Sequence, residues 1–171
     1  MRQSPPTTSL ANIVIRDAVA SDIPAILALY DAGRVDGAAA TPSDPAHPGC
    51  RAAFELIAAD PNQRLLVALL DHQIVATVQI SFIPGLARDG MLRGLLESVH
   101  VRADLRGHGI GSHLVNRAVA ICRERGCGLV QLTSNKNRRD AHRFYRALGF
   151  EQSHEGFKLF IDPAAPAGNP Q

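Results

Sequence analysis

The sequence has few of the residues that cross-linked, metal-bound or membrane-spanning proteins need. Its three cysteines, Cys50, Cys122 and Cys127, are odd in number and lack metal-ligand spacing, so neither a disulfide framework nor a metal site is expected. No apolar run approaches the ~20 residues of a membrane helix, and the polar start of the chain lacks the apolar core of a signal peptide. We therefore expect a cytoplasmic protein that does not bind a membrane.

The chain is short enough to form one domain. Its 171 residues are 46% hydrophobic, which suffices for a single core, whereas two domains would each be unusually small. Proline, serine and threonine dominate the first residues, and proline and glycine dominate the last. We expect a single domain over residues 12–162, with flexible segments at 1–11 and 163–171.

The modest net charge of +2 conceals a division along the chain. Residues 102–146 hold ten Arg or Lys against three acids, a net +7, which leaves −5 for the remainder. The basic window either forms solvated helix faces or attracts a polyanionic ligand. A nucleic acid partner is not expected, because aromatic residues make up only 5% of the chain and do not interleave with the basic ones.

The apolar periodicities predict an α/β protein with a mixed sheet and helices on its faces. Strands are predicted at residues 12–16, 65–70, 73–83, 92–101, 129–133, 150–153 and 157–161, the last two as a hairpin. Helices are predicted at residues 22–30, 51–59, 110–125 and 140–148, with Gly126 and Gly149 ending the last two.

The strongest local signal is a glycine-rich turn between a predicted strand and a predicted helix. Gly107, Gly109 and Gly111 let several backbone N–H groups converge, and the helix N-terminus adds partial positive charge, so the turn predicts an anion site. A P-loop is disfavoured because no Gly-Lys-Ser/Thr is present, and Ser112 stands where a dinucleotide fingerprint needs its last glycine. Glycines at a tight connection without a ligand are the alternative.

Two motifs together carry a resemblance to a known family. The first is R-x-x-G-x-G, and the second is the run SNKNRRDAHRFYRALGF; their key residues are Arg106, Gly109, Gly111, Asn137, Ala141, Tyr145, Gly149 and Phe150. This pattern resembles the acyl-CoA signature of the GNAT superfamily of N-acetyltransferases. The resemblance implies a mostly antiparallel central sheet with splayed strands, acetyl-CoA as cosubstrate, a primary amine of a small molecule or protein as acceptor, and a homodimer.

The resemblance also implies which residues hold the cofactor. The pantetheine arm would lie along the strand that precedes the turn, and the pyrophosphate would sit on the turn itself. Asn137 would bond the cofactor from the opposite side. The implied cofactor residues are Val99, His100, Val101, Arg106, Gly107, His108, Gly109, Ile110, Gly111, Ser112, Asn137 and Tyr145.

Two residues are expected to move protons. In the family a glutamate near the position of Glu97 often accepts the amine proton, and a tyrosine at the position of Tyr145 often protonates the departing thiolate. Glu97 facing water and Tyr145 as a core aromatic are the alternatives. His100 titrates near neutrality, but regular strand alternation directs it away from Glu97, which favours a structural role.

Acceptor selection is expected from the first helix and from a turn after the third predicted strand. The candidate residues are Tyr30, Asp31 and Phe82, of which Asp31 would attract an ammonium group. Simple solvation of Asp31 at a helix end is the alternative. The alternative function for the whole chain is a catalytically inactive module that binds acyl-CoA for regulation.

Overall fold

A computed structural model describes residues 10–34 and 41–161, in which five strands form one sheet in the order β1-β2-β3-β4-β5. The strands are β1 (Ile13–Asp17), β2 (Gln63–Leu70), β3 (Gln73–Ile83), β4 (Arg93–Val101) and β5 (Leu129–Leu132). The α-helices are α1 (Ile23–Ala32), α2 (Pro48–Ala59), α3 (Ala87–Gly90), α4 (Ile110–Glu124) and α5 (Arg139–Ala147). Three single 3-10 turns, Leu10–Asn12, Ala20–Asp22 and Ala103–Leu105, complete the elements.

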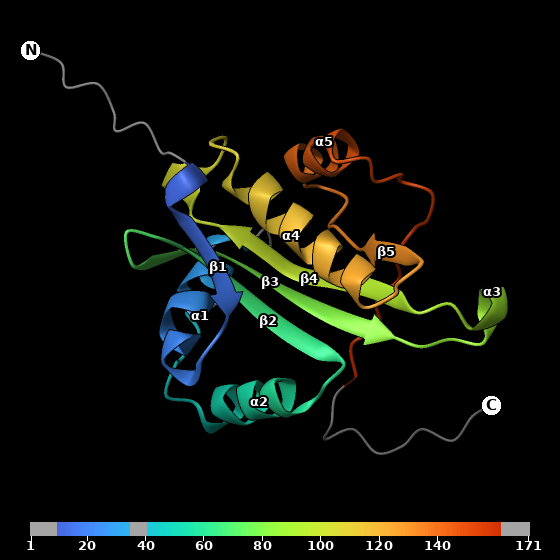
Figure 1. Ribbon diagram of the computed structural model, residues 1–171. Coiled ribbons are helices and arrows are strands. Elements are labelled where there is room, and N and C mark those ends of the chain that lie inside the picture. Colours follow the sequence, from blue (N-terminus) through green and yellow to red (C-terminus); the bar gives the residue numbers. More distant parts are fainter. Residues whose placement is uncertain (1–9, 35–40, 162–171) are drawn as a thin grey trace, which may run out of the picture.

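The sheet is antiparallel except at its last pair. Strands β1 to β4 pair antiparallel in sequence order, and only β4 and β5 run parallel. Helices α4 and α5 lie on one side of the sheet, and α1 and α2 lie on the other (Figure 1). The predicted mixed sheet with helices on its faces is confirmed.

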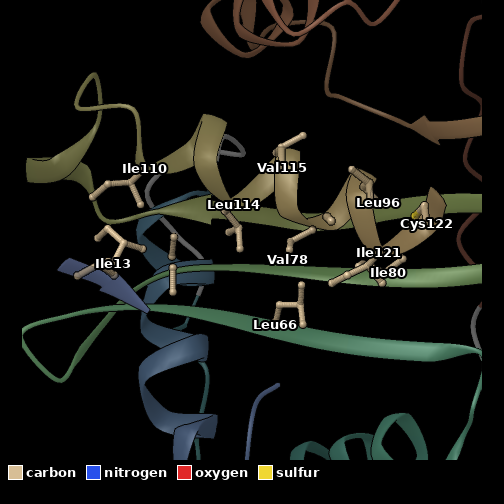
Figure 2. Packing of buried hydrophobic residues seen from close by; sticks show 14 of the residues in the cluster. Ile13, Leu66, Val78, Ile80, Leu96, Ile110, Leu114, Val115, Ile121 and Cys122 are labelled. Atoms are coloured by element: carbon tan, nitrogen blue, oxygen red, sulfur yellow. The ribbon is translucent and has the colours of Figure 1, made fainter. Parts of the chain in front are cut away.

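The main core lies between α4 and the sheet (Figure 2). Leu114, Val115 and Ala118 of α4 are fully buried, as are Val78 and Ile80 of β3. These α4 residues recur at spacings of three and four, so the apolar stripe of the helix faces the strands. Cys122 belongs to the same cluster, where it is a fully buried thiol.

A smaller core joins α1 and α2 to the opposite face of the sheet. Ile26, Leu65 and Val67 are its buried members. The start of α1 is fixed by Asp22, whose carboxylate accepts hydrogen bonds from Arg16 Nη1 at 2.6 Å, Arg16 Nη2 at 3.1 Å and the Val19 amide at 2.8 Å. Asp22 is buried, and its hydrogen bonds with Arg16 hold the pKa of the carboxyl below its usual range.

The predicted final hairpin is wrong. No strand is present in the described residues after α5, and residues 150–161 form irregular structure. Phe157, Leu159, Phe160 and Ile161 are between 82% and 93% exposed. Alternating apolar residues indicate which side of a strand would be buried, but a strand forms only where a neighbour completes its hydrogen bonds. Here the four-residue strand β5 offers little edge for pairing.

The other predicted elements are present, with ends that differ by at most three residues from the predicted ones. The hairpin turn at Asp71 and His72 has positive φ at both residues, as a tight two-residue connection requires. The predicted flexible segments, 1–11 and 163–171, fall outside the described residues except for Leu10 and Ala11. Within residues 10–34 and 41–161, no helix is long and apolar enough to cross a membrane.

Candidate active site

Strand β4 has one free edge over half its length. It pairs with β5 only from Arg93 to Leu96, whereas its pairing with β3 continues to Val101. The main-chain groups of residues 97–101 on the β5 side therefore have no neighbouring strand among the described residues. This divergence is the predicted splay, and it leaves a row of backbone donors and acceptors open to a ligand.

A bulge at Ser98 changes which side chains share a face of β4. Gln79 pairs with Glu97 and Thr77 pairs with His100, so Val78 alone stands opposite Ser98 and Val99. Ser98 has a φ of 52°, in the left-handed region. Because residues opposite one another in an antiparallel pair share a face, Glu97 and His100 lie on the same side of the sheet. The predicted alternation, which directed His100 away from Glu97, is wrong.

His100 is packed beneath α1. Its ring lies 5.0 Å from the ring of Tyr30, and a Cβ placed on Gly33 would overlap it. Nδ1 is buried and has no hydrogen-bond partner among the described residues. Burial lowers the pKa of His100, and Arg138 and Arg106 act in the same direction, while the Ser98 backbone opposes them. The lowered pKa therefore favours the neutral form of the His100 imidazole beneath α1.

The turn before α4 has the geometry of an anion site. Gly107 and Gly109 both have a φ of 81°, which an L side chain rarely adopts. Gly109 is the N-cap of α4 and supplies no side chain, so the N–H groups of Ile110, Gly111 and Ser112 have no partner within the helix. This end of a 15-residue helix carries partial positive charge.

Two side chains of the turn are held by backbone groups. Arg106 Nε donates to the Val101 carbonyl at 3.1 Å, which fixes the guanidinium beside the end of β4. His108 Nδ1 lies 3.0 Å from the Arg106 carbonyl. Gly111 lies close to β4 and α5, because an added Cβ would be 3.4 Å from both Val101 Cγ2 and Phe144 Cζ. The turn is therefore tied to the free edge of β4 and to α5.

Helix α5 carries Tyr145 on the same side of the sheet as α4. The Tyr145 ring contacts the rings of Phe144 and Phe150, with centroids 5.0 Å and 5.8 Å away. Burial raises the pKa of Tyr145, and Arg138 partly opposes that effect. The phenol therefore stays protonated at neutral pH. Asn137 is exposed before α5, where its carbonyl accepts from the Arg139 amide at 3.1 Å.

The opposite face of the sheet contains a cavity of about 490 Å³, between α1, α2 and strands β2 to β4. Tyr30, Gln79 and Ser98 form its polar part, and Gln79 is the register partner of Glu97. Tyr30 is a predicted acceptor residue and does line this cavity. Burial raises the pKa of Tyr30, against the effects of the Ser98 and Thr77 side chains.

The other two predicted acceptor residues lie elsewhere. The Asp31 carboxylate accepts hydrogen bonds at 2.8 Å from both the amide and the hydroxyl of Ser43, and it pairs with Arg34 at 3.2 Å. Both of its oxygens are thus engaged. Phe82 is buried in the core on the α4 side, where the Arg125 guanidinium lies 5.4 Å from its ring centre. Neither residue lines the cavity.

The sequence analysis did not predict the positions of three residues in this region. Ser98 and Gln79 reach the cavity, and Ser134, just after β5, has a buried hydroxyl without a partner among the described residues. The positions of these three side chains depend on how β3 pairs with β4 and on where β5 ends. A serine and a glutamine in ordinary strand sequence give no local signal of such contacts.

Comparison with known proteins decides the family. The model of the acetyltransferase (GNAT) family matches residues 31–150. The chain belongs to this family. The matched residues include the motif of the glycine turn and the motif on α5. The splay between β4 and β5 is the one that the resemblance to this family implied.

The individual proteins that are similar to this chain cover different shares of it. Aminoalkylphosphonate N-acetyltransferase of Salmonella typhimurium is 35% identical over 98 residues, which are 57% of this chain but 63% of the relative, less than two thirds of its length. The structure of a transcriptional regulator from Bacillus halodurans C-125 superimposes with a TM-score of 0.81 and 39% identity, over 87% of this chain and 99% of that one. Glucosamine-6-phosphate N-acetyltransferase of Arabidopsis thaliana shares the fold, with a TM-score of 0.73 and 21% identity over 88% and 99% of the two chains.

Proposed function

We propose that this GNAT protein transfers an acetyl group from acetyl-CoA to a primary amine. The observation that carries the proposal is the free edge of β4 ending in the turn of unpaired N–H groups at the start of α4. An extended ligand with amides at one end and phosphates at the other matches both parts of this surface.

The residues present fit an acyl-CoA. The free main-chain groups of Val99 and Val101 are available to pair with pantetheine amides, although Arg106 already uses one lone pair of the Val101 carbonyl. The N–H groups from Ile110 to Ser112, with Arg106 beside them, suit a pyrophosphate. When bound, acetyl-CoA supplies an activated acyl thioester.

Glu97 and Tyr145 are the residues of this chain that we propose to move protons. Glu97 is exposed on β4, next to the polar part of the cavity, so a water-linked carboxylate there can accept a proton from an ammonium group. Tyr145 lies on the α4 side, and its raised pKa keeps the phenol protonated as a donor for a departing thiolate. The two groups thus lie on opposite faces of the sheet.

A calorimetric titration with acetyl-CoA tests the cofactor site. Gly109 and Gly126 lie at opposite ends of α4 with φ values of 81° and 84°, so valine imposes the same backbone strain at either position. We expect Gly109→Val to weaken acetyl-CoA binding by at least about tenfold and Gly126→Val to leave it unchanged. Equal affinities in both variants would contradict the site.

Turnover is measured as free thiol released in the presence of an amine. The printed name of the Salmonella relative puts an aminoalkylphosphonate among the acceptors to assay, beside primary amines that carry no anionic group. Thiol release that depends on the amine is the expected result. Tight binding of acetyl-CoA without thiol release from any amine would favour an inactive binding module instead.

We also propose that the protein forms a homodimer through the apolar segment of residues 157–161. Its four large side chains are almost fully exposed, and Gly156 passes beside the end of β5, where an added Cβ would lie 3.7 Å from Thr133 Cγ2. A second copy would cover an apolar surface of this kind. Sedimentation velocity should give a dimer for the wild type and a monomer for Phe157→Asp with Phe160→Asp. A wild-type monomer at all concentrations would contradict this.

The domain limits and the location are part of the same proposal. We propose that residues 12–162 form one folding unit and that the protein acts in the cytoplasm. Limited proteolysis should leave a fragment with these ends, and cell fractionation should recover the protein with cytosolic markers. A stable fragment ending within residues 12–162, or recovery with membranes, would contradict the respective proposal.

A further inference from the structure

We infer that the acceptor is a primary amine with a compact apolar body and no anionic group. This inference rests on the proposed acetyl transfer and concerns the cavity between α1, α2 and the sheet. Its volume of about 490 Å³ lies in the range of sites that enclose small organic ligands. The chemistry of its walls selects the acceptor.

The cavity is apolar on most of its wall. Helix α1 contributes aliphatic side chains, α2 contributes aliphatic and aromatic ones, and β2 adds one more. These apolar lining residues are Ile23, Ile26, Leu27, Ala53, Phe54, Ile57 and Leu65. An alkyl or aryl group placed among them loses its contact with water, which favours binding in proportion to its area.

The polar part of the cavity lies at the reacting strand. Ser98 belongs to the bulge of β4, and Gln79 is the register partner of Glu97. The Tyr30 hydroxyl, kept neutral by the burial that raises its pKa, lies near Ser98. An amphiphilic amine would therefore place its nitrogen toward Glu97 and its apolar body between α1 and α2.

Among the described residues, no arginine or lysine lines the cavity, so these walls offer no counter-charge for an acidic group. His47 lines the cavity, and its Nδ1 accepts a hydrogen bond from the Gly49 amide at 3.0 Å as the N-cap of α2. A phosphonate or sugar phosphate in this cavity would lose its hydration without gaining an ion pair, which disfavours its binding.

An acceptor series with one variable group tests this inference. 2-Phenylethylamine and 2-aminoethylphosphonate both present a primary amine on a two-carbon arm, and they differ in the group at the far end. We expect kcat/KM for 2-phenylethylamine to exceed that for 2-aminoethylphosphonate by about tenfold or more, from burial of the ring alone. Hexylamine should follow the aryl amine, and glucosamine-6-phosphate should follow the phosphonate.

A pair of alanines on α2 supplies a variant and its control. Ala53 lines the cavity, whereas its neighbour Ala52 is also exposed but does not line it. Ala53→Trp should raise the KM for 2-phenylethylamine by about tenfold, and it should weaken calorimetric binding of that amine in the presence of coenzyme A to the same extent. Ala52→Trp should change neither value, and both variants should keep the wild-type affinity for acetyl-CoA.

The outcomes separate this inference from the proposed function. Faster turnover of the phosphonate than of the aryl amine would overturn the inference and leave acetyl transfer standing. Acetyl-CoA binding without thiol release from the apolar amines would also overturn the inference. If Ala53→Trp impaired only the use of longer acyl-CoA thioesters, the cavity would hold an acyl chain and the inference would fail. Absence of acetyl-CoA binding by the folded wild type would overturn both.

Discussion

The two faces of the sheet are built differently, although they share the same strands. On the α4 face, 15 buried residues form one cluster that includes the fully buried side chains of α4. On the α1 and α2 face, three buried residues, Ile26, Leu65 and Val67, form the core, and a cavity lies beside them. One face is a closed core and the other is a partly open wall.

This difference separates two tasks. The glycine turn and Tyr145 are attached to the closed face, where packing fixes backbone positions for the cosubstrate. Tyr30, Ser98 and the cavity belong to the open face, where we expect substitutions to change the choice of acceptor without disturbing the main core. The comparison predicts that variants on the closed face affect stability and cofactor binding, whereas variants on the open face affect the acceptor.

The largest effect on stability is expected in the closed core. Leu114 of α4 is fully buried, so Leu114→Ala should lower the free energy of unfolding by about 3 kcal/mol, because the removed atoms leave an enclosed void. Ile57 of α2 already borders the cavity, and Ile57→Ala should cost about 1 kcal/mol. Urea denaturation measures both values. Equal losses would mean that the two faces are packed alike.

The chain's two tyrosines extend the comparison to catalysis. Tyr145→Phe removes the proposed acid and should lower kcat by roughly 10²-fold while the KM for acetyl-CoA is retained. Tyr30→Phe should instead raise the KM for the amine. Burial raises the pKa of Tyr145, so the wild-type rate should show no loss from its ionisation below about pH 10. Steady-state kinetics with both substrates varied separates the cases, and an unchanged kcat in Tyr145→Phe would remove the residue from the mechanism.

What could be predicted from the sequence follows the same division. Helix α4 and its glycine turn were predictable, because apolar spacing, Gly109 and Gly126 are local signals. The Ser98 bulge was not, because it depends on how β3 pairs with β4, and it reversed the predicted orientation of His100. The cavity is also non-local, since its walls come from α1, α2 and three strands. The prediction of a final hairpin was wrong because residues 150–161 have no strand to pair with in the described chain.

A pH-dependent effect is expected at the start of α1. The Asp22 carboxyl has a lowered pKa in the folded state, so its contribution to stability is present above the unfolded value of about 3.9 and is lost as the pH falls through the folded value. Asp22→Asn should cost about 2 kcal/mol at pH 7, because hydrogen bonds to a charged group are lost. The acid-induced loss of stability should also become shallower.

A control for Asp22 is the pair of Asp17 with Arg64. Their atoms are also 2.6 Å apart, but the Asp17 side chain is 59% exposed, whereas that of Asp22 is 8% exposed. Asp17→Asn should therefore change the unfolding free energy by less than about 1 kcal/mol. Denaturation curves measured from pH 7 to pH 3 compare the two variants. The same loss in both would show that burial of Asp22 does not matter.

The smallest effect concerns His100, on the open face. Burial lowers its pKa in the folded protein, so the unfolded chain binds a proton first when the pH falls below about 6.5. Stability should therefore decrease from pH 7 to pH 5, and this decrease should be smaller in His100→Gln, since glutamine does not titrate. His113→Gln, at an exposed position of α4, should keep the wild-type slope. If His100→Gln also keeps that slope, the imidazole is not held neutral beneath α1.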